Sequence, residues 1–154
     1  MPNPYSHINL GYLESITDGS QELIKELINI FIEQIPEFKE GFEEGLVEKD
    51  WSQVAAVAHK AKSSVMSMGM EELGNKELKN LELIAKLLKI EELSNTSADS
   101  EEIQQLKKSI DSYSDERKDW LNNNKNEQAV KAIINHFNQT CDAAIIELQD
   151  VLEN

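Results

Sequence analysis

The spacing of apolar residues limits what this chain can fold into. Apolar side chains recur at steps of three and four residues through most of the sequence, and the strict alternation typical of a β-strand is scarce. Only three prolines and six glycines interrupt the chain, and two of the prolines lie near its start. The pattern predicts an all-α fold, whose strongest amphipathic stretches are residues 20–48, 51–68, 70–92 and 127–152.

Four helices with short connections favour an antiparallel bundle around one hydrophobic core. The chain has 154 residues, so we expect a single domain over residues 1–154, with a short helix at 9–16 before the bundle. Pro36 should break or kink the first long helix, because it lacks an amide donor and clashes with the preceding turn. Gly41 and Gly45 weaken that helix by about 1 kcal/mol each relative to alanine.

The segment 94–125 has few apolar positions and differs from the rest of the chain. Residues 94–98 are small and polar, which is typical of a loop. Asp99 followed by Glu102 matches a capping box and predicts the start of a polar helix, which the asparagines at 122–124 break. We expect this segment to be a helical insertion that lies on the bundle or projects from it.

The charge balance limits the partners of the chain. The net charge is -14, with 29 acidic and 15 basic residues, which argues against binding to nucleic acids or anionic membrane surfaces. Cys141 is the only cysteine, and no signal peptide or membrane-spanning apolar run is present. We expect a cytoplasmic, monomeric protein that binds neither nucleic acids nor membranes.

The sequence lacks the common motifs of metal and phosphate sites. His7, His59 and His136 are far apart, and no histidine lies at metal-ligand spacing with a second ligand on one helix. Glycine-rich phosphate loops are also absent. Cys141 lies on the apolar stripe of the last helix and is expected in the core. We therefore expect neither a metal site nor a bound cofactor.

One helix has an outer face that exposure to water does not explain. Asp50 can cap its start, and Gly69 is suited to end it. A helix that faces only water would carry glutamate and lysine on that side, whereas this face is small and partly apolar. We expect a partner to contact it. The face consists of Ser52, Ala55, Ala56, His59, Lys62, Ser63 and Met66.

The chemistry of this face centres on His59, although a lone surface histidine usually has no function. A neutral imidazole has a free lone pair and is a competent nucleophile towards phosphorus. Lys62 projects from the same face and can place its ammonium near phosphoryl oxygens, and Ser63 is small enough for a close approach. No second catalytic group lies nearby. The pattern predicts a phosphoryl-accepting histidine rather than a complete enzyme site.

The segment AHKAKSSVMSMG at residues 58–69 resembles the signature of histidine-containing phosphotransfer (HPt) domains of two-component phosphorelays. In that family a lysine lies three residues after the histidine, and a small residue, usually glycine, lies four after it. His59, Lys62 and Ser63 occupy these positions. A Leu-Gly-like turn follows in the family, and Met68-Gly69 matches it here.

The resemblance extends to the order of the helices over residues 9–92, and the last helix would complete an HPt-like bundle. The sequence departs from the family at Ser63, which replaces the usual glycine, at Ala61, where leucine is common, and in the long segment 94–125. The serine does not remove the chemistry, since it leaves the histidine and lysine in place, but it narrows the space for a partner.

The resemblance implies a phosphoryl carrier that is not itself an enzyme. It would accept the group from an aspartate of a receiver domain in a hybrid sensor kinase, or from a kinase domain. It would then pass the group to an aspartate of a response regulator. Magnesium would belong to the receiver domain. The face of the histidine helix, together with Leu13 and Ile16 of the short N-terminal helix, would receive the partner.

Two other hypotheses remain open. An acidic helical adaptor or inhibitor could bind a signalling partner without carrying phosphate, although a chain of that kind needs neither His59 nor Lys62. The chain could also be the phosphate-accepting domain of a larger kinase. Because it begins with Met1 and contains no kinase segment, we expect a separate protein.

Overall fold

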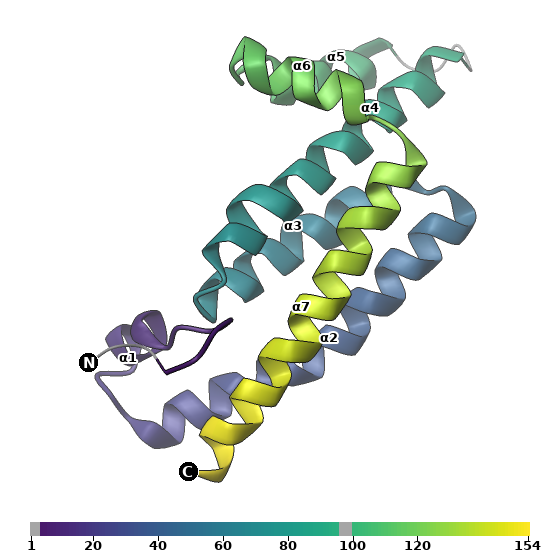
Figure 1. Ribbon diagram of the computed structural model, residues 1–154. Helices are drawn as coiled ribbons and strands as arrows, with labels where there is room; N and C mark the ends of the chain where they lie inside the picture. Colours follow the sequence, from purple (N-terminus) through teal and green to yellow (C-terminus); the bar gives the residue numbers. More distant parts are fainter. Residues whose placement is uncertain (1–3, 96–99) are drawn as a thin grey trace.

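A computed structural model describes residues 4–95 and 100–154 of the chain, and every regular element in these ranges is a helix. In Figure 1 four long helical segments lie side by side and form the predicted antiparallel bundle, with α1 at one end and α5 and α6 at the other. The all-α prediction is confirmed. The elements are α1 (Gly11–Ile16), α2 (Gln21–Glu48), α3 (Trp51–Ser67), the π-helix η1 (Leu73–Leu78), α4 (Lys79–Asn95), α5 (Ser100–Asp111), α6 (Asp115–Asn124) and α7 (Glu127–Glu153).

Three helices of the bundle, α2, α3 and α7, begin at side-chain caps. The Ser20 hydroxyl accepts a hydrogen bond from the Leu23 amide, and the Asp50 carboxylate accepts one from the Gln53 amide at 3.1 Å. Gly69 follows α3 with φ of +84°, a conformation that glycine adopts without strain. These contacts confirm the predicted start and end of the histidine helix.

Helix α2 runs without interruption from Gln21 to Glu48, so Pro36 does not break it, and that part of the predicted break or kink is wrong. Pro36 lies on the exposed side of the helix, whereas Ile35 and Phe38 beside it are buried. Burial of the apolar stripe on both sides of the proline keeps the helix together.

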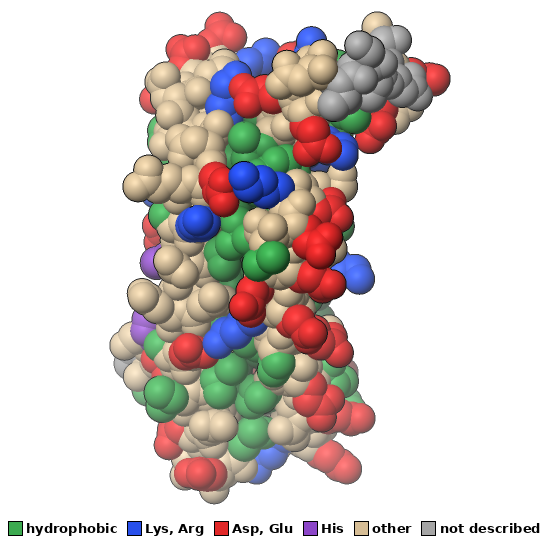
Figure 2. Space-filling view, turned by 90° about the vertical axis from the view of Figure 1, so that its right-hand side faces the viewer, with side chains coloured by type: hydrophobic (Ala, Val, Ile, Leu, Met, Phe, Trp, Pro, Cys, Tyr) green, Lys and Arg blue, Asp and Glu red, His purple; other side chains and the backbone are tan. Residues whose placement is uncertain are grey.

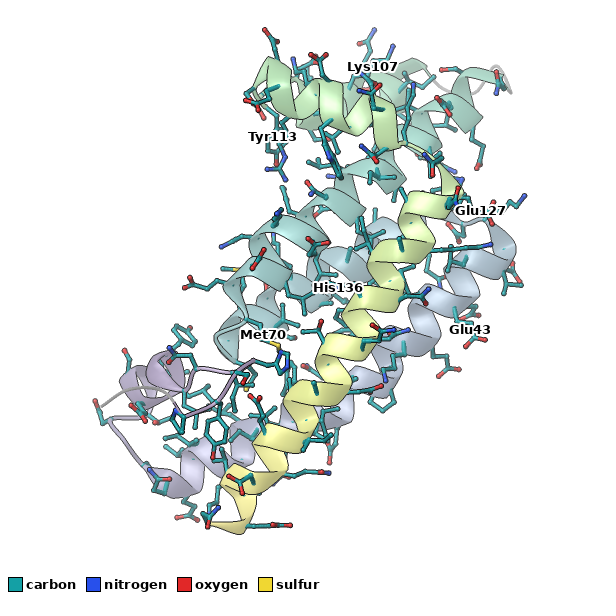
Figure 3. All side chains as sticks on the ribbon, viewed as in Figure 1. Glu43, Met70, Lys107, Tyr113, Glu127 and His136 are labelled. Atoms are coloured by element: carbon teal, nitrogen blue, oxygen red, sulfur yellow. The ribbon has the colours of Figure 1, made fainter. Side chains whose placement is uncertain are left out.

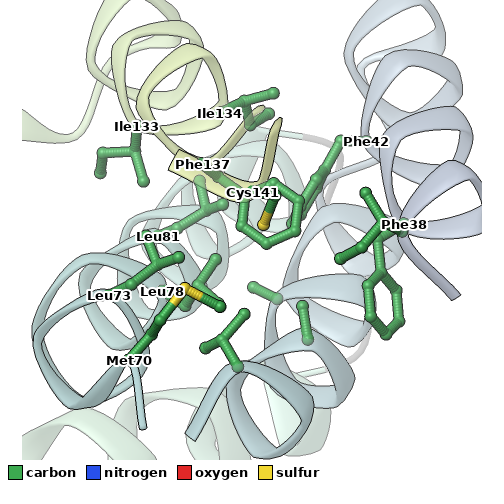
Figure 4. Close-up of a cluster of buried hydrophobic side chains, with 14 of the residues drawn as sticks. Phe38, Phe42, Met70, Leu73, Leu78, Leu81, Ile133, Ile134, Phe137 and Cys141 are labelled. Carbon is green, nitrogen blue, oxygen red and sulfur yellow. The ribbon is translucent and has the colours of Figure 1, made fainter. Parts of the chain in front are cut away.

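The core of the bundle lies between α2, α3, α4 and α7. Figure 4 shows Phe38 and Phe42 of α2 beside Phe137 and Cys141 of α7. The Phe42 and Phe137 rings pack edge to face with centroids 5.3 Å apart. Burial raises the pKa of the Cys141 thiol to about 12, which keeps it protonated and unreactive at neutral pH. Cys141 is therefore a core residue, as predicted.

Two glycines of α2 let α3 approach closely. A Cβ atom added at Gly41 would lie 2.9 Å from a methyl carbon of Val57, and one added at Gly45 would lie 2.8 Å from a methyl carbon of Val54. Real Cβ atoms do not approach other carbons so closely. The loss of helix propensity at these glycines is thus offset by helix packing.

The segment after α3 begins differently from the single α-helix predicted at 70–92. Its first turns form the π-helix η1, which continues directly into α4. Gly74 of η1 lies against α3, where an added Cβ would be 2.4 Å from the Met66 Cγ. The wider turns lie at this close contact with α3, and the spacing of apolar residues does not reveal them.

The insertion contains two helices, whereas the sequence predicts one. Ser114 caps α6 through the Arg117 amide and separates it from α5. The Tyr113 ring, labelled in Figure 3, has the Lys79 ammonium 5.5 Å and the Arg117 guanidinium 5.3 Å from its centroid. The Lys79 contact attaches the insertion to α4, far from α1 (Figure 1). The predicted Asp99 cap and residues 96–98 of the predicted loop lie outside the described residues.

The surface carries the acidic excess of the chain. Figure 2 shows acidic side chains gathered along one side of the face seen from the right of Figure 1. Within residues 4–95 and 100–154, none of the glutamates of α2 forms an ion pair. These carboxylates are therefore free to interact with solvent or with a partner.

We expect Gly45→Ala to destabilise the protein by about 1 kcal/mol, because overpacking against Val54 outweighs the gain in helix propensity. Urea unfolding measures the change. In a Val54→Ala background the same substitution should cost less, since the clashing methyl groups are gone. Equal costs in the two backgrounds would show that the close contact is unimportant.

Candidate functional site

His59 lies on the exposed side of α3, close to α4. Its side chain is 67% exposed, and its Nδ1 lies 3.3 Å from the Oε1 of Glu82. Glu82 belongs to α4 and is only 4% exposed. Lys86, one turn further along α4, places its Nζ 3.1 Å from the other carboxylate oxygen. The ring is thus held by a buried carboxylate that is itself held by a lysine.

The charge of Glu82 determines the orientation of the ring. Burial works to raise the pKa of this carboxyl group, but the hydrogen bond and charge of Lys86, the charge of Lys79 and the hydrogen bond of His59 outweigh it. The net result is a pKa below the usual value, so the group is ionised at neutral pH and only accepts hydrogen bonds.

A neutral imidazole beside this carboxylate must donate its proton from Nδ1, which leaves the lone pair on Nε2. Because Nδ1 faces the buried Glu82 and the ring is largely exposed, Nε2 is directed away from the bundle. The arrangement prepares Nε2 to act as a nucleophile towards a group brought by a partner.

Glu82 is not among the residues that the sequence predicts for the site. The only available signal was a glutamate between Leu81 and Leu83 in the apolar run of α4, where a charged residue needs a partner if it is buried. The spacing within α3 contains no information about a residue 23 positions further along the chain.

Lys62 lies one turn from His59, on the side of α3 that packs against η1. It is partly buried, and its carbonyl oxygen lies near Gly74. Its ammonium group forms no ion pair with another residue in the described part of the chain. This cation is therefore available to an anion placed at His59.

A hollow of about 540 Å³ lies beside His59, between α2 and α3. We call it the histidine groove. Its floor contains Ser64, whose hydroxyl donates a hydrogen bond of 3.0 Å to the Gln34 side chain of α2. The lining residues are Gln34, Glu37, Phe38, Val57, His59, Lys60, Ser63 and Ser64.

A second hollow of about 260 Å³, the α1 groove, adjoins the first and shares Gln34, Ser63 and Ser64 with it. It lies between α1, α2 and α3 and is mainly apolar. Tyr12 and Ile16 of α1 line it and are 54% and 53% exposed. Together the two grooves form one shallow surface that leads from exposed apolar side chains to His59.

The structure places the predicted docking residues in different surroundings. Ser63 lines both grooves and is exposed, whereas Ser52 and Ala56 are exposed on α3 but line neither groove. Ala55 and Met66 are half-buried, and Met66 packs on Gly74.

On α1, Ile16 is exposed, but Leu13 is 1% exposed and forms part of the groove wall. Tyr12, Ile30 and Gln34 also line this surface, although the sequence does not predict them there. Tyr12 and Ile30 could have been recognised as surface residues for a partner, because each is an apolar residue that lies beside the buried stripe of its helix.

The other histidines do not join this site. His7 and His136 line a separate hollow beside η1 and α7, and Figure 3 shows His136 on α7. No group of three or more potential metal-ligating side chains has a suitable arrangement in residues 4–95 and 100–154. Within the same residues, no helix is long and apolar enough to span a membrane.

The comparison with protein families agrees with the site. The family model of the Hpt domain matches residues 26–116, more than half of the chain. The match includes His59, Lys62 and Glu82, whereas α1 and α7 lie outside it. No curated protein and no solved structure matches the chain significantly. The chain belongs to the Hpt domain family, whose members are histidine phosphotransfer carriers in phosphorelays.

The lowered pKa of Glu82 predicts a pH-dependent contribution to stability. The ionised carboxylate stabilises the folded state fully above the ordinary value of 4.5, and this contribution is lost as the pH falls through the lower folded-state pKa. The stability advantage of the wild type over Glu82→Gln should therefore be constant around neutral pH and shrink as the pH falls below the ordinary value of 4.5. Urea unfolding of both proteins measures it. Glu153→Gln, on an exposed turn of α7, is the control, and a constant advantage of the wild type would contradict the prediction.

Proposed function

We propose that the protein is a phosphorelay carrier that accepts a phosphoryl group on Nε2 of His59. The donor is an aspartyl phosphate on a receiver domain, or a kinase, and the acceptor is an aspartate of a response regulator. One observation carries the proposal: the exposed ring of His59 is held through Nδ1 by the ionised, buried Glu82 at the edge of a groove.

The transfer is a displacement at phosphorus. Nε2 forms a bond to phosphorus while the bond from phosphorus to the aspartate oxygen of the partner breaks, and the electron pair stays on that carboxylate. The ring keeps its proton on Nδ1 and becomes a cation, and Glu82 balances its charge. The reverse process delivers the group to the next aspartate. The chain turns over no substrate of its own, so the protein is a carrier and not an enzyme.

Lys62 and Glu82 stabilise opposite charges in this process. The ammonium of Lys62 balances the phosphoryl oxygens, and the carboxylate of Glu82 balances the ring. Magnesium is supplied by the receiver domain, and the proposal requires no cofactor in this chain.

The histidine groove and the α1 groove together provide the docking surface. A receiver domain would place apolar side chains against Tyr12, Ile16 and Ile30, and its aspartate would then lie near His59. Ser63, which replaces the glycine usual in the family, lies where the two grooves meet. Its hydroxyl would therefore contact the partner beside His59. The proposal places this docking in the cytoplasm and treats the carrier as a monomer.

The assignment of His59 is tested by transfer of labelled phosphate from a phosphorylated receiver domain. The wild type should acquire a label that is stable in alkali and labile in acid, and His59→Gln should acquire none. His136→Gln, which changes an exposed histidine of α7, should behave like the wild type. Label retained in His59→Gln would refute the assignment. An absence of label in the wild type, with retained binding to the receiver, would favour a non-phosphorylated adaptor.

The roles of Lys62 and Glu82 are tested by Lys62→Ala and Glu82→Gln. Each should slow transfer roughly ten- to a hundredfold, since one charge-assisted interaction of about 1.5–3 kcal/mol is lost at the reacting groups. Lys62→Ala should also shorten the lifetime of the phosphohistidine. Rapid mixing with the phosphorylated receiver measures the rates, and Lys131→Ala is the control for loss of a lysine. Unchanged rates would remove the proposed role of the residue concerned.

A further inference from the structure

The N-terminal arm, residues 5–9, is held by a carboxylate at the far end of the chain. The backbone amides of Ser6, His7 and Ile8 all donate hydrogen bonds to the Glu147 carboxylate of α7, with distances of 3.2, 3.0 and 3.2 Å. Three consecutive amides around one carboxylate form a binding site for a negative charge. The Tyr5 hydroxyl adds a hydrogen bond of 2.9 Å to Asp150, one turn further along α7.

The other end of the arm is attached to the end of α3. The Asn9 amide donates to the Met68 carbonyl oxygen at 2.9 Å. The Asn9 backbone lies directly on Gly69, where an added Cβ would be 2.5 Å from the Asn9 oxygen. Ile8, between the two attachments, is buried in the core. The arm therefore connects α7 with the turn that follows the histidine helix.

Helix α1 depends on this arm for its position. It has six residues, too few for a stable isolated helix, and Leu13 is its one buried residue. It begins two residues after Asn9, so the attached arm fixes its start. Because Tyr12 and Ile16 of α1 line the α1 groove, the position of half the docking surface depends on Glu147.

We propose that Glu147 is a positioning residue for partner docking: through three backbone amides it holds the arm that places α1, and so completes the α1 groove. This inference rests on the proposed function, since it concerns the docking of the same receiver domain. Glu147 touches neither the phosphoryl group nor the partner. It lies on α7, outside the residues that match the family model.

The charged carboxylate is the essential part of the contact, because it accepts all three hydrogen bonds with both oxygens. In Glu147→Gln the amide nitrogen replaces one acceptor with a donor, and it faces backbone donors. The shape of the side chain is kept, so the effect isolates the loss of the acceptor. Glu153→Gln is the matched control, since it removes one carboxylate from the exposed last turn of the same helix.

The test separates docking from chemistry. With a phosphorylated receiver as the donor, Glu147→Gln should raise KM by about tenfold with little change in the maximal rate. Phosphoramidate, a small donor that needs no docking surface, should phosphorylate His59 in the wild type and in Glu147→Gln at the same rate. Hydrogen exchange should become faster at residues 6–8 and in α1 of Glu147→Gln, while α2 and α3 keep their protection. Glu153→Gln should match the wild type in every measurement.

The outcomes distinguish this inference from the function on which it rests. An unchanged KM in Glu147→Gln, alongside wild-type transfer, would overturn the inference alone. An equal loss of rate with phosphoramidate would also overturn it, because the residue would then act on the histidine rather than on docking. A wild type that accepts phosphate from no receiver domain would overturn both the proposed function and the inference.

Discussion

The close packing of α3 between two neighbours determines where the rest of the molecule lies. Ala58 and Ala61 of α3 are fully buried, and glycines on α2 and η1 meet its other sides. With such small residues at the contacts the helices are near the minimum separation, and rotation of α3 would bring larger side chains into collision. The direction in which His59 points is therefore set by the backbone packing of three helices, before any polar contact forms.

Among the residues around α3, Glu82 is the one whose burial is unfavourable for stability. A buried carboxylate loses its hydration, and only well-placed partners repay that loss. Lys86 supplies one partner and the His59 ring supplies the other, so the ion pair and the orientation of the ring depend on each other. A neutral core residue would pack at position 82 with less cost. The charge is explained by what it does to the imidazole rather than by stability alone.

The sequence predicts those parts of the structure that depend on neighbours along the chain. The apolar spacing located the four bundle helices, Asp50 located the start of α3, and the interval from His59 to Lys62 pointed to phosphoryl chemistry. Contacts between distant residues were missed. Glu82 reaches His59 only after α3 and α4 pair, and Tyr12 and Ile30 form one groove only after α1 folds over α2.

Local rules also failed where packing opposed them. Proline disfavours the interior of a helix, yet the buried residues on both sides of Pro36 keep α2 continuous. Apolar spacing does not distinguish the turns of a π-helix from those of an α-helix, and so η1 was predicted as part of an ordinary helix. Ser114 divides the insertion at a helix cap, and serine is among the residues that favour such a position.

The place of α7 at the end of the chain has a consequence for how the protein is made. Helix α3 pairs with α2 before it and with η1 and α4 after it. These elements are neighbours in the chain, so they can pair over short loops as soon as they are synthesised. Helix α7 pairs with α2 across nearly the whole chain, beyond the insertion, and the N-terminal arm has its carboxylate partner only when α7 is present. During synthesis on a ribosome, the segment with His59 can thus pair with its neighbours before the arm has a place to bind. The docking surface is completed last.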